Sequence, residues 1–576
     1  MKALSLMTIT ITFLCWEIVV GQEKIPDHGY SRVSLTVIYI DDPSPDPNGG
    51  LSSSVRNFVE NTKLIGPKFN DHSLPSRFVR IDIPNFTAEN RIMSTSGTDT
   101  RAIRDFLAGS DISRQIVAKW FDRKPDGTLN MNLIGQRGLY NAKDNDYLTA
   151  TASQRQLGSL KDQGEKLLKL SYLLFINFSD IQYKEPKTTP GKGDYCGSGR
   201  GFLYKLTWND SVSAQFYENL WISENDPESV KAEKKRKFDS TVFPMEFVRD
   251  VSYNVAPSLI VLPNDKRTDE EKRTALLNNL YDNILLEIEN RVPDFQVRQN
   301  LISSKPIGAT IGLKEGVYVD QRFFVYENVQ KKNQEVYKRR RAVVRAKQVA
   351  DNQKITEGKS KPTTFYQVAG GKIDHFGMFL EQKNDHGISV TASVLSGEMG
   401  GLNLTLGYNL SRTLSKTMKM KTIPTGVYLF ADLAVDPGKY IYVTVPGYYS
   451  SDANKNYQFT RVSIGLSKDF YFLHHFQLSP RIGYGIETTS LYAKGDNASF
   501  PDGLSITGDH LLAGGSFGMN LLHNVQLIAG ANYYYQMEDN FITVGSNQPV
   551  SIGIKWQSVF NNRSGLSFFG GLRILL

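Results

Sequence analysis

Cysteine is the scarcest residue type in this 576-residue chain, and its scarcity excludes whole classes of site. Only two cysteines are present, and Cys15 lies in a segment that we expect to be removed from the mature protein. Cys196 would then be the only one left. A single cysteine forms no internal disulfide, and it cannot build a cysteine-based metal site.

The sequence also lacks the common catalytic and phosphate-binding motifs. There is no His-Glu-x-x-His, no Gly-x-Ser-x-Gly and no glycine loop of the P-loop or dinucleotide type. The glycine-rich stretch 191–201 has neither the spacing nor the strand-to-helix setting of such a loop. We therefore expect no cofactor, no bound metal and no enzymatic activity.

Long apolar runs are missing beyond the N-terminus. Residues 1–21 have the pattern of a signal peptide, with Lys2, then the apolar segment Ala3–Trp16, then small residues before Gln22. The alternative, a membrane anchor, is weaker because the apolar run is shorter than ~18 residues. No later segment is long and apolar enough for a membrane helix, and the mean hydropathy of −0.33 is too polar for a helical membrane protein.

What the chain does contain is strict alternation along its C-terminal third. For example, Ile388, Val390 and Ala392 alternate with Ser389 and Thr391. A period of two predicts β-strands, because successive side chains point to opposite faces. The second face carries Gly, Ser, Asn, Gln and Thr, whereas a soluble sandwich would carry Lys, Glu and Asp there. This pattern predicts an antiparallel transmembrane β-barrel, with a soluble β-domain as the alternative.

We expect about ten barrel strands, with eight to twelve compatible with the pattern. Short connections, such as 436–438 and 522–524, follow odd-numbered strands in this count. Because short turns normally face the periplasm, ten strands would leave both ends of the barrel outside the cell. Either one strand is miscounted or some long connections are periplasmic. The expected strands are 387–396, 401–411, 426–435, 439–445, 457–467, 475–487, 510–521, 525–537, 549–559 and 565–576.

The region before the barrel predicts a multidomain chain. Residues 22–300 have the mixed pattern of a soluble α+β domain, in which Thr268–Val292 is the clearest helix because it starts with a capping-box pattern and carries one apolar stripe. Residues 301–375 change to short strands, which predicts a small β-module. The barrel then spans 376–576, where Phe376–Glu381 is a candidate for an eleventh strand.

The end of the chain resembles the C-terminal signal that outer-membrane assembly machinery reads. Gly571, Ile574 and Leu576 match its Gly-x-x-apolar-x-apolar ending, although the last residue is Leu where an aromatic is usual. The C-terminal third is thus similar to outer-membrane β-barrel proteins of Bacteroidetes-type bacteria. Ala118–Phe121, followed by Ile134–Ala142, is similar to a block in uncharacterised secreted proteins of the same group. The resemblance implies outer-membrane lipid and the barrel-assembly machinery as partners, and a periplasmic N-terminal domain of no known activity.

Two runs of basic residues are candidates for binding anions: Lys231–Lys237 and Lys338–Lys347. Nucleic acid is excluded as a partner for an exported protein. In a cell envelope the available anions are lipopolysaccharide phosphates and peptidoglycan carboxylates, which such residues attract. The alternative is a solvated hairpin whose charges discourage strand pairing. The candidate patch consists of Lys338, Arg339, Arg340, Arg341 and Arg345.

Other candidates lie within the expected strands. Asp432, Arg481, Lys555 and Arg573 are predicted to face the lumen, where they would fill a narrow barrel rather than line a wide pore. Some small barrels are hydrolases with Ser–His or Asp–His groupings at the rim. The corresponding groupings here are His474–His475 with Ser479, and Asp509–His510, and neither belongs to a family motif.

The sequence therefore favours an outer-membrane-anchored structural or interaction protein. Its soluble domain, expected in the periplasm with the outside of the cell as the alternative, would bind another envelope component such as lipopolysaccharide, peptidoglycan or an envelope protein. A barrel-embedded hydrolase that acts on lipids or peptides, and a narrow channel, are the alternatives.

Overall fold

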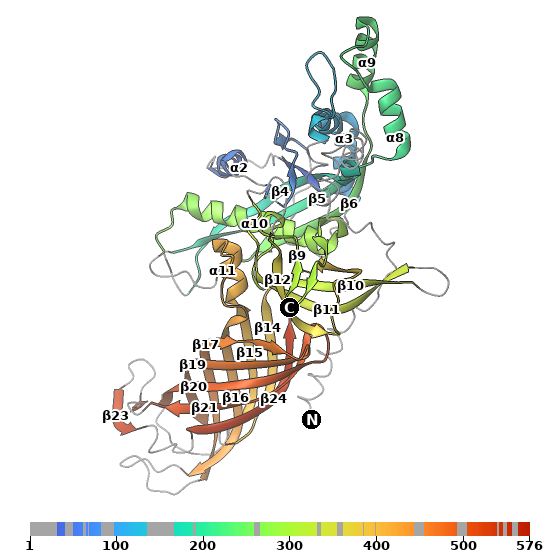
Figure 1. Cartoon of the computed structure of the whole chain (residues 1–576). Helices are drawn as coiled ribbons and strands as arrows, with labels where there is room; N and C mark the ends of the chain where they lie inside the picture. Colours follow the sequence, from blue (N-terminus) through green and yellow to red (C-terminus); the bar gives the residue numbers. More distant parts are fainter. Residues whose placement is uncertain are drawn as a thin grey trace.

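The computed structural model arranges the chain in three consecutive parts, shown one above the other in Figure 1. A sheet with helices comes first, a smaller sheet follows, and a barrel of long strands comes last. The expected signal peptide 1–21 lies outside the described residues, as does most of the block Ile134–Ala142. The described residues are 32–40, 50–61, 65–66, 68–81, 97–134, 166–187, 190, 192–258, 265–330, 336–353, 361–383, 385–397, 399–442, 454–491, 504–537, 541–544, 550–555 and 563–576.

The first part is built on a mixed sheet in the order β2-β1-β4-β5-β6, with β3 also paired to β1. Strand β1 is parallel to its neighbours, whereas β5 is antiparallel to both β4 and β6. The strands are β1 (Ser34–Ile40), β2 (Asn70–Asp71), β3 (Phe78–Val79), β4 (Ser171–Lys184), β5 (Asp194–Leu206) and β6 (Met245–Val255).

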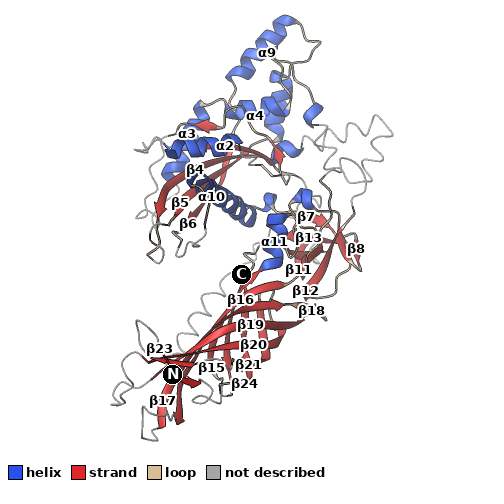
Figure 2. Ribbon diagram, turned by 90° about the vertical axis from the view of Figure 1, so that its left-hand side faces the viewer, coloured by secondary structure: helices blue, strands red, loops and turns tan. Residues whose placement is uncertain are grey.

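Helices cover both faces of this sheet (Figure 2). Strand β4 shows why: Leu173 and Phe175 join the apolar core on one side, while Leu174 and Ile176 join the core on the other. A strand that is buried on both faces reads as a continuous apolar run, which explains the sequence around residues 170–178. The first core contains α3 (Gly97–Gly109) and α4 (Ile112–Trp120), and the second contains α2 (Gly50–Asn61) and α10 (Asp269–Arg291). Two further helices are α8 (Asp210–Gln215) and α9 (Glu228–Ser240).

Helix α10 confirms the capping box expected from the sequence. The Thr268 amide donates to the Glu271 carboxylate at 2.7 Å, and the Glu271 amide donates to the Thr268 hydroxyl at 3.2 Å. The apolar stripe of the helix, which includes Leu280 and Ile284, packs on strand β5. Among the helices in the described part of the chain, none has the length and apolar character needed to cross a membrane.

The second part is a seven-stranded sheet in the order β7-β13-β10-β11-β12-β9-β8. Strand β13 pairs with β10 and β7, so the segment considered as an eleventh barrel strand belongs to this sheet. We call this part the β-module. Its strands are β7 (Arg298–Asn300), β8 (Ser303–Ser304), β9 (Ile307–Ala309), β10 (Arg322–Gln330), β11 (Val336–Gln348), β12 (Thr363–Gly370) and β13 (Met378–Gln382).

The third part is a closed antiparallel barrel of eight strands. Each strand pairs with the next along the chain, and the last closes on the first, because Val390 pairs with Ile574. The strands are β14 (Ile388–Leu395), β15 (Gly401–Asn409), β16 (Val427–Tyr442), β17 (Asn454–Lys468), β19 (Phe476–Leu491), β20 (Leu504–Asn520), β21 (Val525–Gln536) and β24 (Gly565–Leu575). Helix α11 (Leu410–Met418) connects β15 to β16, and β18 (Phe470–Phe472) lies beside β19.

The expected count of ten strands differs from this ring for two reasons. The segments 426–435 and 439–445 belong to one strand, β16, whose pairing with β17 continues across a bulge between Asp436 and Lys439. The expected strand 549–559 corresponds to β23 (Val550–Lys555), which pairs with β22 (Phe541–Val544) outside the ring. A bulge and a hairpin extension both keep the local period of two, so alternation alone does not distinguish them from separate barrel strands.

The eight-stranded ring changes which connections share one end of the barrel. The start of β14 and the end of β24 lie at the barrel end that faces the β-module (Figure 1). The turns 469–475 and 521–524 lie at this same end, together with α11. At the opposite end β16, β19 and β21 finish at least eleven residues before the next ring strand begins, whereas only five residues separate β14 from β15.

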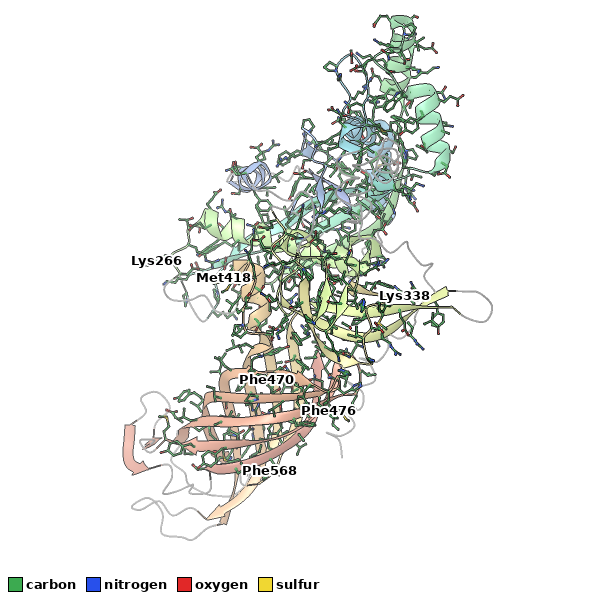
Figure 3. All side chains as sticks on the ribbon, in the orientation of Figure 1. Lys266, Lys338, Met418, Phe470, Phe476 and Phe568 are labelled. Atoms are coloured by element: carbon green, nitrogen blue, oxygen red, sulfur yellow. The ribbon has the colours of Figure 1, made fainter. Side chains whose placement is uncertain are left out.

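Most apolar side chains of the ring point away from the barrel, while the polar ones point inward together with a few apolar ones, such as Phe430 and Phe569. Leu404, Ile464 and Ile482 are 42%, 55% and 64% exposed, although each lies in the middle of a strand. On the same strands Asn403 and Ser463 are buried. Aromatic rings lie on the outside of the barrel, with Phe470 and Phe476 near the β-module and Phe568 further along (Figure 3).

Candidate functional site

The centre of the barrel is filled by Arg481 and its partners. Its guanidinium lies 3.2 Å from the Asp432 carboxylate and donates to the Asn532 side chain at 2.9 Å. The same group stacks over the rings of Phe430 and Phe569, at 5.4 and 5.0 Å from their centroids. The cavity nearby measures only about 50 Å³.

Arg573, the third of the expected lumen residues, lies near the β-module end. It forms an ion pair with Asp469 at 3.0 Å, and Asp469 also accepts from the Ser479 hydroxyl at 2.8 Å. Lys555, the fourth, does not belong to the lumen of the ring, because it is in β23. Alternation alone predicts a barrel strand at that position, and the hairpin of β22 and β23 has the same alternation.

A second ion network closes the far half of the lumen. Glu487 accepts from Arg563 at 2.7 and 2.9 Å and from Arg461 at 3.3 Å, while Arg563 also reaches Asp436 at 3.3 Å. All four side chains are nearly inaccessible to solvent. Sequence reasoning missed this network. The sequence does contain a sign of it, because each of the four residues is charged and lies within or next to a strand of alternating apolar residues.

The Ser–His and Asp–His groupings considered in the sequence have different surroundings. His474 and His475 are exposed at the turn before β19, whereas Ser479 points into the barrel, so they do not form a pair. His510 points inward and its Nε2 lies 3.0 Å from the Ser463 hydroxyl. Both Ser463 and His510 are buried inside the filled lumen.

The junction of the β-module and the barrel holds a buried charge cluster, which we call the junction cluster. Asp385, just before β14, lies 2.5 Å from Arg345 of β11, 3.4 Å from Arg412 of α11 and 3.6 Å from Arg322 of β10. Asp320 completes it: its carboxylate accepts from the Gly426 amide at 2.6 Å and from the Asn409 side chain at 3.1 Å. The junction cluster therefore connects strands of the β-module with helix α11 and with the segments that begin the barrel strands.

Burial and charge act in opposite directions on these carboxyl groups. Burial favours the neutral form of Asp385, but the nearby arginines outweigh it, so its pKa lies below the usual range. Burial raises the pKa of Asp320, and its interaction with Arg345 and its hydrogen bonds only partly offset that effect. Asp385 is thus the fixed anion of the junction cluster.

The predicted basic patch is divided between surface and interior. Arg345 is 3% exposed and belongs to the junction cluster, so it offers nothing to an external anion. Lys338 pairs with Glu381 at 3.4 Å, and Glu327 pairs with both Arg339 and Arg341. Arg340 stacks over Phe324 at 5.0 Å. Lys338 projects from the side of the β-module in Figure 3.

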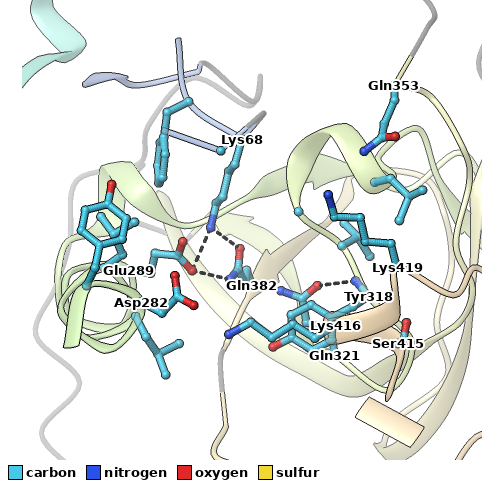
Figure 4. Close-up of a pocket in the computed structure, with 18 residues that line it drawn as sticks. Lys68, Asp282, Glu289, Tyr318, Gln321, Gln353, Gln382, Ser415, Lys416 and Lys419 are labelled. Atoms are coloured by element: carbon cyan, nitrogen blue, oxygen red, sulfur yellow. Dashed lines mark hydrogen bonds and ion pairs between the residues drawn. The ribbon is translucent and has the colours of Figure 1, made fainter. Parts of the chain in front are cut away.

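A pocket lies where the first part, the β-module and α11 meet (Figure 4). Its volume is about 340 Å³. Lys68 forms an ion pair with Glu289 of α10 at 3.0 Å and donates to Gln382 at 3.1 Å, and Gln382 donates to Glu289 at 3.2 Å. Burial lowers the pKa of Lys68, and Glu289 counteracts that effect. We call this cavity the junction pocket.

Comparison with known proteins identifies no relative by sequence. No family model matches the chain, and no curated protein matches it. Among solved structures, Neisserial surface protein A aligns with 33% of this chain and 94% of its own, at 14% identity and a TM-score of 0.19. The N-terminal β-barrel domain of Pseudomonas aeruginosa OprF aligns with 33% of this chain and 98% of its own, at 10% identity and a TM-score of 0.19. A major outer membrane protein from Thermus thermophilus aligns with 33% and 98%, at 15% identity and a TM-score of 0.24.

Proposed function

We propose that the barrel anchors this protein in an outer membrane and that the first part of the chain binds another component of the cell envelope from the periplasm. The observation that carries the proposal is the reversal of polarity in the barrel. Its outside is lined by exposed Leu, Ile, Val, Tyr and Phe, while its inside holds ion pairs and amides. A soluble fold would hide the first set in its core, whereas acyl chains accept it.

The periplasmic orientation rests on the connections of the eight-stranded ring. Short turns face the periplasm in bacterial barrels of this kind, and long connections face outward. The short turns 469–475 and 521–524 lie at the end that faces the β-module, whereas β16, β19 and β21 finish at the opposite end, at least eleven residues before the next ring strand begins. The β-module and the first part of the chain would therefore be periplasmic, and the bound component would be lipopolysaccharide, peptidoglycan or an envelope protein.

A rigid junction fits an anchored platform. The junction cluster joins strands of the β-module to the segments at the barrel mouth, and Asn520 of β20 donates to the Val368 carbonyl of β12 at 2.9 Å. Separating the β-module from the barrel would leave the buried charges of Arg345 and Asp385 without their partners, so the docked arrangement is favoured. A conducting pore is disfavoured by the filled lumen, and hydrolysis is disfavoured by the burial of His510 and Ser463.

Protease treatment of intact cells, followed by mass spectrometry of released peptides, tests the orientation. We expect no peptides from 97–134 or 192–258 unless the outer membrane is first permeabilised. Their release from intact cells would contradict the periplasmic placement. Fractionation tests the anchor itself, because recovery of the full chain in the soluble fraction without detergent would contradict it.

The alternatives have direct assays. The purified protein is expected to give no conductance steps in planar bilayers, and steady conductance would favour the channel. It is also expected to hydrolyse neither phospholipid nor peptide substrates. Activity that disappears in a His510→Asn variant would favour the hydrolase.

A further inference from the structure

We propose that the junction pocket binds a small amphiphile with an apolar body and one carboxylate. The walls of the pocket supply the apolar contact. They come from α10 and the segment before β2 on one side, and from the β-module on the other. The apolar lining residues are Phe69, Tyr281, Leu285, Leu286, Leu313 and Val317. A cavity of about 340 Å³ has the size of a small-molecule site.

The polar end of the ligand is set by Lys416 and Lys419. Both line the pocket from α11 and the residue that caps it, and both are exposed. Among the residues that the structure describes, neither has an ion-pair partner. The third ammonium group, Lys68, is already engaged by Glu289 at 3.0 Å. The ammonium groups that remain for a ligand are therefore those of Lys416, which also faces Asp282, and of Lys419 (Figure 4).

The acidic residues limit the charge of the ligand to one negative group. Glu289 and Asp282 belong to α10, and the Lys416 side chain reaches from α11 towards Asp282, while Lys419 points away from both carboxylates (Figure 4). A ligand with an anionic group at both ends would meet repulsion from these carboxylates. A cationic amphiphile would meet Lys416 and Lys419 instead. An apolar body with a single carboxylate satisfies both sides.

Two sources could supply this chemistry, an acyl chain or an apolar amino acid with a blocked amine. Helix α11 starts directly at the end of barrel strand β15, so the pocket lies just beyond the barrel mouth. The proposal does not depend on the orientation or the partner proposed above, because a nanodisc exposes both faces of the protein to the same solution.

The test is calorimetric titration of the full chain in phosphatidylcholine nanodiscs, with empty nanodiscs subtracted. The probes are octanoate, octanol, octylamine, acetate and N-acetyl-phenylalanine. We expect saturable binding of octanoate, with octanol, octylamine and acetate at least about tenfold weaker. Tighter binding of N-acetyl-phenylalanine than of octanoate would assign the source to an amino acid, and the reverse would assign it to an acyl chain. Equal binding of octanoate and octanol, or of octanoate and acetate, would overturn the proposal.

Variants locate the site. The double substitution Lys416→Gln with Lys419→Gln is expected to weaken octanoate binding about tenfold, since each removes one partly exposed charge contact. Asp282→Asn is expected to tighten it, because a repelling carboxylate is lost. Lys266→Gln is the matched control, because Lys266 is an exposed lysine that does not line the pocket. Unchanged affinity in the double variant, with a normal melting temperature, would refute the assignment.

Discussion

Arg345 and Asp385 form a buried ion pair of 2.5 Å that joins the middle of the β-module to the start of the barrel. Neither side chain is more than 4% exposed. The two residues belong to different parts of the chain, and the Arg345 guanidinium also donates to the Asp320 carbonyl at 2.6 Å. This pair makes the β-module a fixed cap on the barrel, and its removal gives the first of four predictions.

Asp385→Ala is expected to destabilise the docked β-module by about 3–5 kcal/mol, because three arginines would be left buried without their common anion. Thermal unfolding in detergent measures the loss, and limited proteolysis reports whether the β-module detaches. Asp351→Ala is the matched control: it removes an exposed carboxylate from its pair with Lys421, at a cost of less than about 1 kcal/mol. Equal losses in the two variants would contradict the role of the junction cluster.

The contact between His523 and Phe324 predicts a pH dependence of docking. His523 lies in the turn 521–524, and its ring packs edge-on against Phe324 of the β-module, with centroids 5.4 Å apart. Burial lowers the pKa of His523 to about 4, and Arg340 and Arg322 add to the effect. The pKa of His523 is therefore lower in the folded protein than in the unfolded chain. The contribution of His523 to the stability of the folded protein is fully present above pH ~6.5 and is lost as the pH falls towards 4.

His523→Phe should remove that pH dependence. The loss in the parent protein is less than about 3 kcal/mol between pH ~6.5 and 4. Melting temperatures at a series of pH values compare the parent with the variant, and His475→Phe serves as control because His475 is exposed. The same slope in parent and variant would show that other groups carry the pH dependence.

Gly465→Ala is expected to destabilise the barrel by about 1–3 kcal/mol. A Cβ atom at this position would meet the Ile482 carbonyl and would come within 2.6 Å of the Phe430 ring, which packs against Arg481. Gly570→Ala is the control, because its Cβ would meet only one atom, at 3.9 Å. Unfolding in detergent, followed by the heat-dependent mobility of the barrel in gels, should separate the two variants.

The proposed membrane anchor predicts a contrast between two exposed apolar residues. Ile464→Arg is expected to cost about 2–4 kcal/mol of barrel stability in lipid, because it places a charge among acyl chains. Val242→Arg, in the first part of the chain, is the control and should leave the stability unchanged. The two residues are similarly exposed, Val242 at 45% and Ile464 at 55%, so only their surroundings differ. If Ile464→Arg were equally harmless in lipid vesicles, the outside of the barrel would not face lipid.

Alternation along the strands was enough to predict the barrel and the side chains that point out of it. It was also enough to place Asp432, Arg481 and Arg573 inside. Those features follow from the period of two, which the sequence displays directly. The number of strands did not follow, since the bulge in β16 and the β22–β23 hairpin keep the same period. That is why Lys555 was assigned to the lumen.

Only the tertiary structure decided which charges meet. Arg345 lies in the same basic run as Arg339 and Arg341, and nothing local marks it as the buried one. Its burial depends on Asp385, 40 residues later, and on a register between β11 and its neighbours that sequence spacing does not reveal. The junction pocket likewise requires Lys68, Glu289 and Lys416 to be brought together from three parts of the chain. Local periodicity therefore fixes what each strand shows to its two faces, whereas long-range packing fixes the partners.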